Sequence, residues 1–94
     1  MQSDAQNELL REVVIVNALG LHARSAAKLA KIAQKADKGV WLHHGDEQVD
    51  AKEVIDILTL GAARGDRLQI RIDAPADRDT LDQIVALVNS GFGE

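Results

Sequence analysis

The residue with the clearest chemical potential in this 94-residue chain is His22. It follows Gly20, which can adopt a positive φ, and it precedes a run with helical spacing that starts near Ala23. The first backbone N–H groups of a helix have no partner within the helix, and the helix dipole places partial positive charge there. An anion held at His22 would therefore meet the backbone donors of Ala23, Arg24 and Ser25, and we predict a phosphate site at this point.

Basic side chains continue along the predicted helix. Arg24 supplies a planar guanidinium whose paired N–H groups suit phosphate oxygens. Spacings of four, three and four place four basic residues on one helix face, the basic stripe: Arg24, Lys28, Lys31 and Lys35. This stripe would steer an acidic partner towards His22, and its positive charge would favour a neutral, nucleophilic imidazole. A surface histidine beside a solvated helix face is the alternative interpretation of the same residues.

The two other histidines, His43 and His44, carry no comparable signal. Adjacent residues of a strand point to opposite faces of a sheet, so these two side chains cannot bind one metal ion together. The chain has no cysteine, and its histidines lack the spacing of known metal motifs. We therefore predict neither a metal site nor a cofactor.

The composition limits the classes of protein to which this chain can belong. Hydrophobic residues make up 46% of the chain, enough for the core of one domain, while Trp41 and Phe92 are its only aromatic residues. The net charge of −4 and the scarcity of aromatic side chains argue against nucleic-acid binding. No apolar stretch is long enough to span a membrane, and the N-terminus lacks the pattern of a secretory signal. We expect a cytoplasmic protein without membrane insertion.

Hydrophobic periodicity predicts strands and helices in the order βαββαβα. We expect strands over 12–16, 40–44 and 67–73 and a short strand from 48, with helices over 23–36, from about 54 to 61, and from 77 or 79 to 88. Asp50 and Glu53 have the spacing of a capping box before the second helix, and Asp77 or Asp79 would cap the third. This order predicts an α+β fold with helices on one face of a mainly antiparallel sheet.

Two motifs resemble those of the HPr family, the histidine-containing phosphocarriers of the phosphoenolpyruvate-dependent phosphotransferase system. The first is Gly20-Leu21-His22-Ala23-Arg24, which is similar to the active-centre motif of that family. The second comprises residues 49–53 and 58–61, at the distance from the first that the family shows. Because the resemblance covers about residues 11–90, we divide the chain into a flexible N-terminal tail (1–10), a phosphocarrier-like domain (11–90) and a C-terminal tail (91–94).

The resemblance implies a fold and a reaction. The fold would be an open-faced sandwich, in which three helices cover one face of a four-stranded antiparallel sheet. His22 would accept a phosphoryl group on Nδ1 from phosphorylated enzyme I and pass it to a histidine of an enzyme IIA-type protein, while Arg24 neutralises phosphoryl charge. The protein would be a monomeric, stoichiometric carrier and not an enzyme. It would dock transiently through five residues: Lys28, Lys31, Val54, Ile55 and Leu58.

Two positions depart from the usual pattern of the family. Ser25 stands where the family usually has proline, and its hydroxyl could reach a phosphoryl oxygen. Some nitrogen-related members also lack this proline, which favours a regulatory role over bulk sugar transport. Glu53 stands where many members carry a serine that a kinase phosphorylates, so this control would be absent. Its carboxylate either caps the helix or mimics the phosphoserine charge.

A second function is compatible with the same fold. Members of the family that have lost the histidine act only by binding other proteins, so this chain could be a non-catalytic interaction module for a transcriptional or metabolic regulator. Both His22 and Arg24 are retained, which favours the phosphoryl carrier.

Overall fold

The computed structural model describes residues 8–94, so most of the predicted N-terminal tail lies outside the described residues. Within this part the chain forms strands, helices and two short 3-10 turns: β1 (Leu10–Val14), α2 (Ala23–Ala33), β2 (Val40–His44), β3 (Glu47–Asp50), α3 (Val54–Thr59), β4 (Arg67–Ile72), η1 (Pro75–Asp77), α4 (Arg78–Asn89) and η2 (Gly91–Gly93). The order of strands and α-helices is the predicted βαββαβα.

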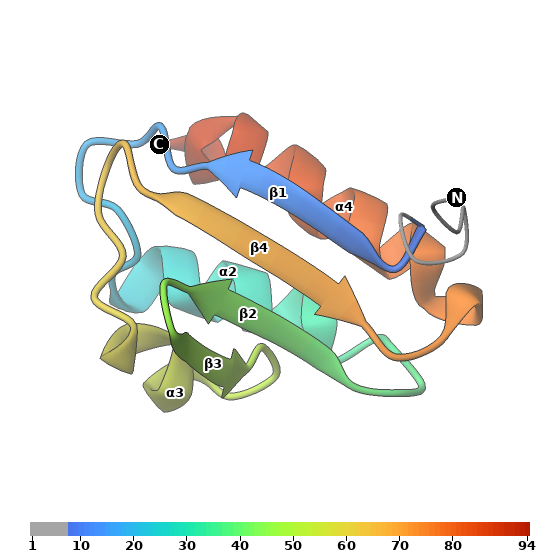
Figure 1. Cartoon of the computed structure of the whole chain (residues 1–94). Coiled ribbons are helices and arrows are strands. Elements are labelled where there is room, and N and C mark those ends of the chain that lie inside the picture. The colour runs from blue at the N-terminus through green and yellow to red at the C-terminus, as the bar shows by residue number, and fades with distance from the viewer. Residues whose placement is uncertain (1–7) are drawn as a thin grey trace, which may run out of the picture.

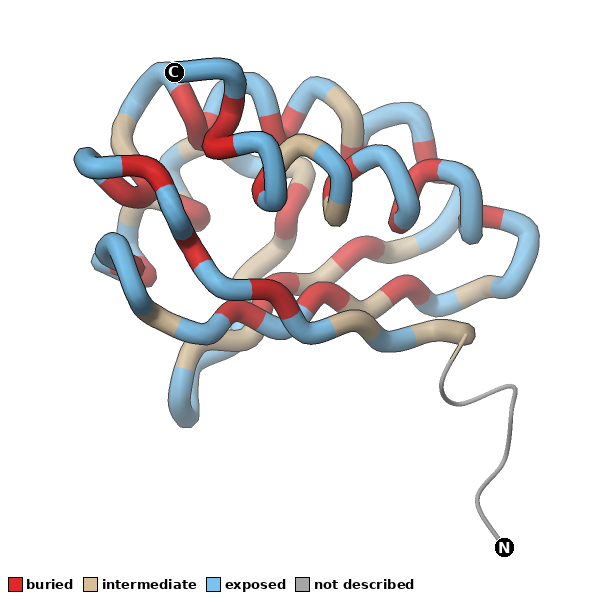
Figure 2. Tube along the Cα trace, turned by 90° about the horizontal axis from the view of Figure 1, so that it is seen from above, coloured by how far each residue is buried: buried red, intermediate tan, exposed pale blue. Residues whose placement is uncertain are grey.

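The four strands form one antiparallel sheet in the order β1-β4-β2-β3. The helices lie on one face of this sheet, and the other face is open (Figure 1, Figure 2). These two layers confirm the predicted open-faced sandwich. Because β4 occupies the second position in the sheet, it is paired on both sides and anchors the fold.

Alternation along the strands explains why one sheet face is buried. In β4, Leu68, Ile70 and Ile72 are fully buried, while the residues between them point to the open face. Aliphatic side chains of two helices cover the buried face: Ala26, Leu29, Ala30 and Ala33 of α2, and Leu81, Ile84 and Val88 of α4. The core is therefore aliphatic, as the composition predicts, except for the buried ring of Phe92.

The ends of β1 and α2 differ from the predicted boundaries. β1 begins at Leu10 and not at residue 12, because its pairing with β4 extends to Arg71. α2 ends at Ala33, before the predicted end at 36. Hydrogen bonds from Lys35 and Ala36 to carbonyls three residues earlier tighten the chain into a turn at this point.

The predicted capping box before α3 is not formed. Glu53 is the N-cap of this helix, but its side chain makes no cap hydrogen bond. Asp50 instead accepts the backbone N–H of Lys52 at 2.8 Å, which stabilises the turn that precedes the helix.

The predicted cap of the last helix has a different role. Asp77 is the N-cap of α4, but its side chain makes no cap hydrogen bond there. Its buried carboxylate accepts the backbone N–H groups of residues 37 and 38, at 3.0 and 2.9 Å. Asp77 therefore fixes the turn after α2 to the start of α4.

The last four residues pack against the domain and do not form the predicted tail. Phe92 of η2 is fully buried, although its φ of 60° lies in the left-handed region that favours glycine. Figure 1 shows this end of the chain beside the loop that joins β1 to α2. The packing of Phe92 thus brings residue 94 close to the start of α2.

Candidate functional site

His22 is the N-cap of α2, the position where the sequence predicted an anion site. Its backbone is extended, with φ of −126° and ψ of −179°, and its carbonyl accepts the first helical hydrogen bond from Ala26 at 2.8 Å. Its ring nitrogen Nδ1 accepts the backbone N–H of Arg24 at 3.3 Å. Nδ1 therefore faces the unpaired donors of the first helical turn.

A glycine turn sets the direction from which the chain enters α2. Gly20 has a φ of +64°, and a Cβ atom there would lie 2.6 Å from the carbonyl oxygen of Ala62. The next residue, Leu21, donates its N–H to the same carbonyl at 3.0 Å. Only glycine fits both the positive φ and this close approach, so Gly20 positions His22 through the backbone.

Ser25 completes a capping box with His22. The backbone N–H of His22 donates to Oγ of Ser25 at 2.9 Å, and this hydroxyl lies 3.0 Å from the carbonyl oxygen of Gly20 and 3.2 Å from that of His22. Ser25 is fully buried. The suggestion that its hydroxyl reaches a phosphoryl oxygen is therefore wrong, because the hydroxyl is committed to the loop. The backbone N–H of Ser25 belongs to the first helical turn.

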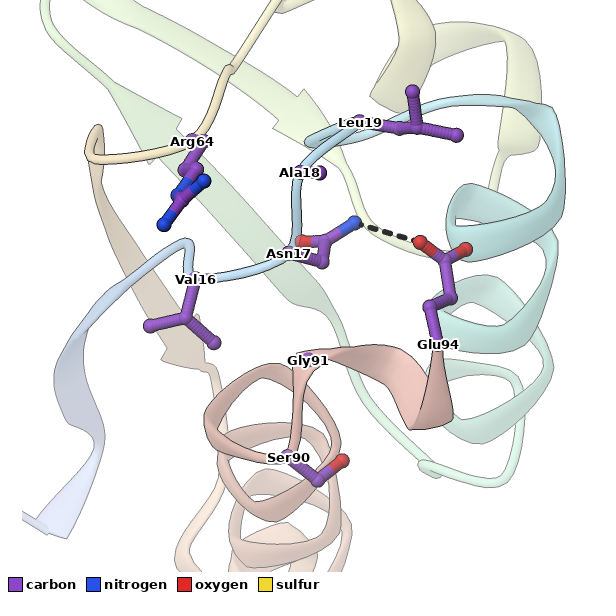
Figure 3. A pocket seen from close by; sticks show the side chains of 8 residues that line it. All are labelled: Val16, Asn17, Ala18, Leu19, Arg64, Ser90, Gly91 and Glu94. Carbon is purple, nitrogen blue, oxygen red and sulfur yellow. Dashed lines mark hydrogen bonds between the residues drawn. The ribbon is translucent and has the colours of Figure 1, made fainter.

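Glu94 is the functional side chain that the sequence did not reveal. One carboxylate oxygen lies 2.5 Å from Nε2 of His22, and the other accepts the side-chain amide of Asn17 at 3.0 Å (Figure 3). The same amide donates to the carbonyl of Gly20 at 2.8 Å. The hydrogen bond from Asn17 above all, and then the contact with His22, lower the pKa of Glu94. The carboxylate is thus ionised and held between two donors.

These partners assign the tautomer of His22. A carboxylate accepts a proton from Nε2, and a backbone N–H needs a lone pair on Nδ1. Both contacts are satisfied when the ring carries its proton on Nε2, which leaves the lone pair on Nδ1. The sequence predicts positive surroundings for His22, and the structure differs from that prediction. The surroundings combine a positive helix terminus at Nδ1 with an anion at Nε2.

The buried ring of Phe92 explains how Glu94 reaches His22, since it fixes the final turn to the core. Lys28 holds the same turn by donating from Nζ to the carbonyl of Phe92 at 2.7 Å. One ammonium of the basic stripe is therefore engaged within the protein. The sequence signal for this turn is weak: Phe92 is one of only two aromatic residues, and it follows the last helical period.

The guanidinium of Arg24 is exposed and makes no hydrogen bond or ion pair within residues 8–94. Its charge contributes to the lowered pKa of Glu94, so it lies near the acid that holds His22. The exposed guanidinium therefore lies beside the N-terminus of α2, and its role in neutralising phosphoryl charge stays a prediction.

The predicted docking residues lie on two neighbouring helices. On α3, Ile55 is 72% exposed, and Val54 and Leu58 are half-buried. On α2, Lys31 is exposed. Glu53 is exposed at the start of α3, and its suggested mimicry of a phosphoserine stays a prediction.

The two strand histidines take separate partners. Nε2 of His44 lies 3.1 Å from a carboxylate oxygen of Asp66. Nε2 of His43 is buried and has no hydrogen-bond partner among the described residues. Residues 8–94 contain no group of three potential metal-ligating side chains, and none of their helices is long and apolar enough to cross a bilayer.

A family model described as "PTS HPr component phosphorylation site" matches residues 9–90, which include His22 and the first turn of α2. This chain belongs to the HPr family. It is 36% identical over 86 residues to phosphocarrier protein HPr of Cupriavidus necator, covering 92% of this chain and 97% of that protein. It is also 37% identical over 83 residues to phosphocarrier protein NPr of Escherichia coli K12, covering 87% of this chain and 92% of that protein.

The fold agrees with this assignment. The crystal structure of HPr-C-His from Thermoanaerobacter tengcongensis superposes with a TM-score of 0.85 at 29% identity, covering 90% of this chain and 96% of that one. Membership of the HPr family supports a phosphoryl-carrier role in the phosphotransferase system. The relatives named NPr represent the nitrogen-related branch that Ser25 suggested.

Proposed function

We propose that this protein carries a phosphoryl group on Nδ1 of His22, accepting it from phosphorylated enzyme I and donating it to enzyme IIA-type proteins. One observation carries the proposal. Nδ1 lies 3.3 Å from the backbone nitrogen of Arg24 in the first turn of α2, while Nε2 contacts the carboxylate of Glu94, and the tautomer that satisfies both contacts leaves a lone pair on Nδ1. The nucleophile and the site for the phosphoryl oxygens are thus adjacent.

The transfer step follows from this arrangement. The Nδ1 lone pair forms a bond to phosphorus while the bond from phosphorus to the donor histidine breaks and its electron pair returns to the donor. Because His22 keeps the proton on Nε2, its ring gains positive charge as the new bond forms. The carboxylate of Glu94 stabilises that charge.

The first turn of α2 receives the phosphoryl oxygens. Bond formation consumes the lone pair that the Arg24 N–H contacts, so this donor turns to a phosphoryl oxygen. The backbone N–H groups of Ala23 and Ser25 point in the same direction. The guanidinium of Arg24 neutralises the remaining charge.

A carrier of this kind is used once per transfer and is regenerated by the acceptor, so we propose a stoichiometric role and not an enzymatic one. Docking is transient and uses side chains on the outer faces of α2 and α3. Lys28, Lys31 and Ile55 are exposed there, and Val54 and Leu58 are half-buried. The protein acts as a cytoplasmic monomer. Ser25 in place of the usual proline favours regulation over bulk sugar transport as its purpose, while relatives named HPr and NPr are about equally similar to this chain.

Incubation with phosphoenolpyruvate and enzyme I tests the proposal. We expect wild-type protein to take up one acid-labile, base-stable phosphate, and His22→Ala to take up none. His44→Ala is the matched control, since this histidine lies on β2, and it should be phosphorylated like wild type. Absence of uptake by wild type, or equal uptake by His22→Ala, would overturn the carrier role and favour the interaction module.

A further inference from the structure

A pocket of about 520 Å³ opens beside the phosphoryl-acceptor site, and the transfer step does not use it. Three segments line it: residues 16–19 after β1, Arg64 in the turn before β4, and the turn at 90–94 (Figure 3). The pocket meets the acceptor site at Glu94, which belongs to both. None of the expected docking residues of α2 and α3 is among the residues that line it.

One wall of this pocket is apolar and exposed. Val16 is 49% exposed and Leu19 is 70% exposed. Isolated exposed aliphatic side chains are ordinary on protein surfaces, but these two line the same hollow. Covering them would remove apolar surface from water, which favours contact with an aliphatic side chain.

The lining of the pocket also includes a cation. Arg64 is exposed and makes no hydrogen bond or ion pair within the described part of the chain. Figure 3 shows Arg64 and Glu94 on opposite sides of Asn17. Because Asn17 and His22 already hold the Glu94 carboxylate, Arg64 is the charge in the pocket that is available to a partner. It is complementary to a carboxylate.

Asn17 connects the pocket to His22. It is 6% exposed, and its side-chain amide donates to Glu94 and to the carbonyl of Gly20. Its side-chain oxygen has no hydrogen-bond partner among the described residues. A segment bound to residues 16–19 would therefore contact the loop whose Asn17 holds both Gly20 and Glu94 beside His22.

We propose that this pocket is a second docking contact for the protein that donates the phosphoryl group. The occupant is a segment of that donor with an aliphatic side chain, which packs on Val16 and Leu19, next to a carboxylate, which pairs with Arg64. We assign the segment to the donor because the donor binds the unphosphorylated carrier. The contact between His22 and Glu94 described above belongs to that unphosphorylated state. The proposal rests on the proposed carrier function.

Steady-state transfer from phosphorylated enzyme I tests the contact, with carrier concentration varied. Arg64→Glu should raise the KM for the carrier about tenfold, and Leu19→Ala about threefold, with kcat within about twofold of wild type. Arg64→Lys, which keeps the charge, should restore most of the affinity. The effect of Arg64→Glu should shrink as ionic strength rises.

Two controls match these changes at the far end of the molecule. Lys38→Glu makes the same charge reversal in an exposed turn after α2, and Leu10→Ala truncates an exposed leucine of β1. A KM for Arg64→Glu and Leu19→Ala equal to that of these controls would overturn the docking contact while leaving the carrier role intact. Failure of the carrier role itself has a different signature, because wild type would then take up no phosphate at all.

Discussion

At the scale of the residue, His22 is suited to its proposed role because its two ring nitrogens have different partners. Nε2 faces the Glu94 carboxylate, and Nδ1 faces the backbone N–H of Arg24. The motif around His22 could be predicted from the sequence, since glycine, histidine and arginine stand next to one another. Glu94 and Asn17 could not, because 77 positions separate them and neither has periodic neighbours.

Glu94→Gln tests the role of this carboxylate. The amide cannot serve Asn17 and His22 together, because it offers one acceptor oxygen where the carboxylate offers two. We expect a mixture of His22 tautomers in place of the Nε2–H form, and transfer from enzyme I slowed roughly two- to tenfold. Nitrogen chemical shifts of the ring report the tautomer. Asp79→Asn on α4 is the control, and wild-type tautomer and rate in Glu94→Gln would refute the role of Glu94.

At the scale of the element, the first turn of α2 depends on Ser25 to fix its N-cap. Removing this buried hydroxyl leaves the partly buried N–H of His22 without its acceptor. We expect Ser25→Ala to lower the free energy of unfolding by about 1–3 kcal/mol. Urea denaturation measures this change, and Ser90→Ala, at an exposed serine, should cost much less. Equal stability of the two variants would contradict the structural role of Ser25.

Strand β2 carries a pH-sensitive residue at His43. Burial, and secondly the charge of Arg71, lower its pKa below the usual 6.5. Its cross-strand neighbours are Gln48 and Gln69, which carry no charge. The unfolded chain therefore binds a proton on His43 at a higher pH than the folded chain does. The stability that His43 contributes is fully present above the pKa that this residue has in the unfolded chain. It is lost as the pH falls from that value through the lower pKa of the folded chain.

We therefore expect wild type to lose more stability than His43→Gln when the pH is lowered from 7.5 to 5. Urea denaturation at both pH values gives the comparison, with all other titrating groups common to the two proteins. The same loss in both proteins would show that His43 is not the responsible group.

Helices and strands also show which parts of the fold are specified by local sequence patterns. Clean alternation predicted β4, and the period of α4 predicted its buried face. The caps were mispredicted because the carboxylates of Asp50 and Asp77 find better donors in neighbouring turns. The donors to Asp77 lie about 40 residues away along the chain, so spacing cannot reveal them. The donor to Asp50 is only two residues away, but it forms a turn that competes with the predicted cap.

At the scale of the whole molecule, the last turn couples the core to the acceptor site. Phe92 is buried in the core, while Glu94 two residues later reaches His22. The sequence could not predict this coupling, because it depends on how the end of α4 meets the loop after β1. Residues 91–94 were assigned to a tail because they lie beyond the part of the chain that resembles the HPr family.

Phe92→Ala tests this coupling. It should lower the free energy of unfolding by about 3–5 kcal/mol and also slow transfer to His22, because Glu94 loses its support. Ile72→Ala is the matched core variant at the far end of β4; it should cost about 2–5 kcal/mol and leave transfer by the folded protein unchanged. Urea denaturation and transfer rates under folding conditions give both readouts. Normal transfer in folded Phe92→Ala would refute the coupling.

In the proposed function, Nδ1 of His22 carries the phosphoryl group. Nuclear magnetic resonance of the phosphorylated protein, labelled with 15N in its histidines, tests it most directly. We predict a phosphorus–nitrogen coupling to Nδ1 of His22, a proton retained on Nε2, and a shifted amide resonance of Arg24 as its N–H turns to a phosphoryl oxygen. A phosphoryl group on Nε2, or on His43 or His44, would contradict the account.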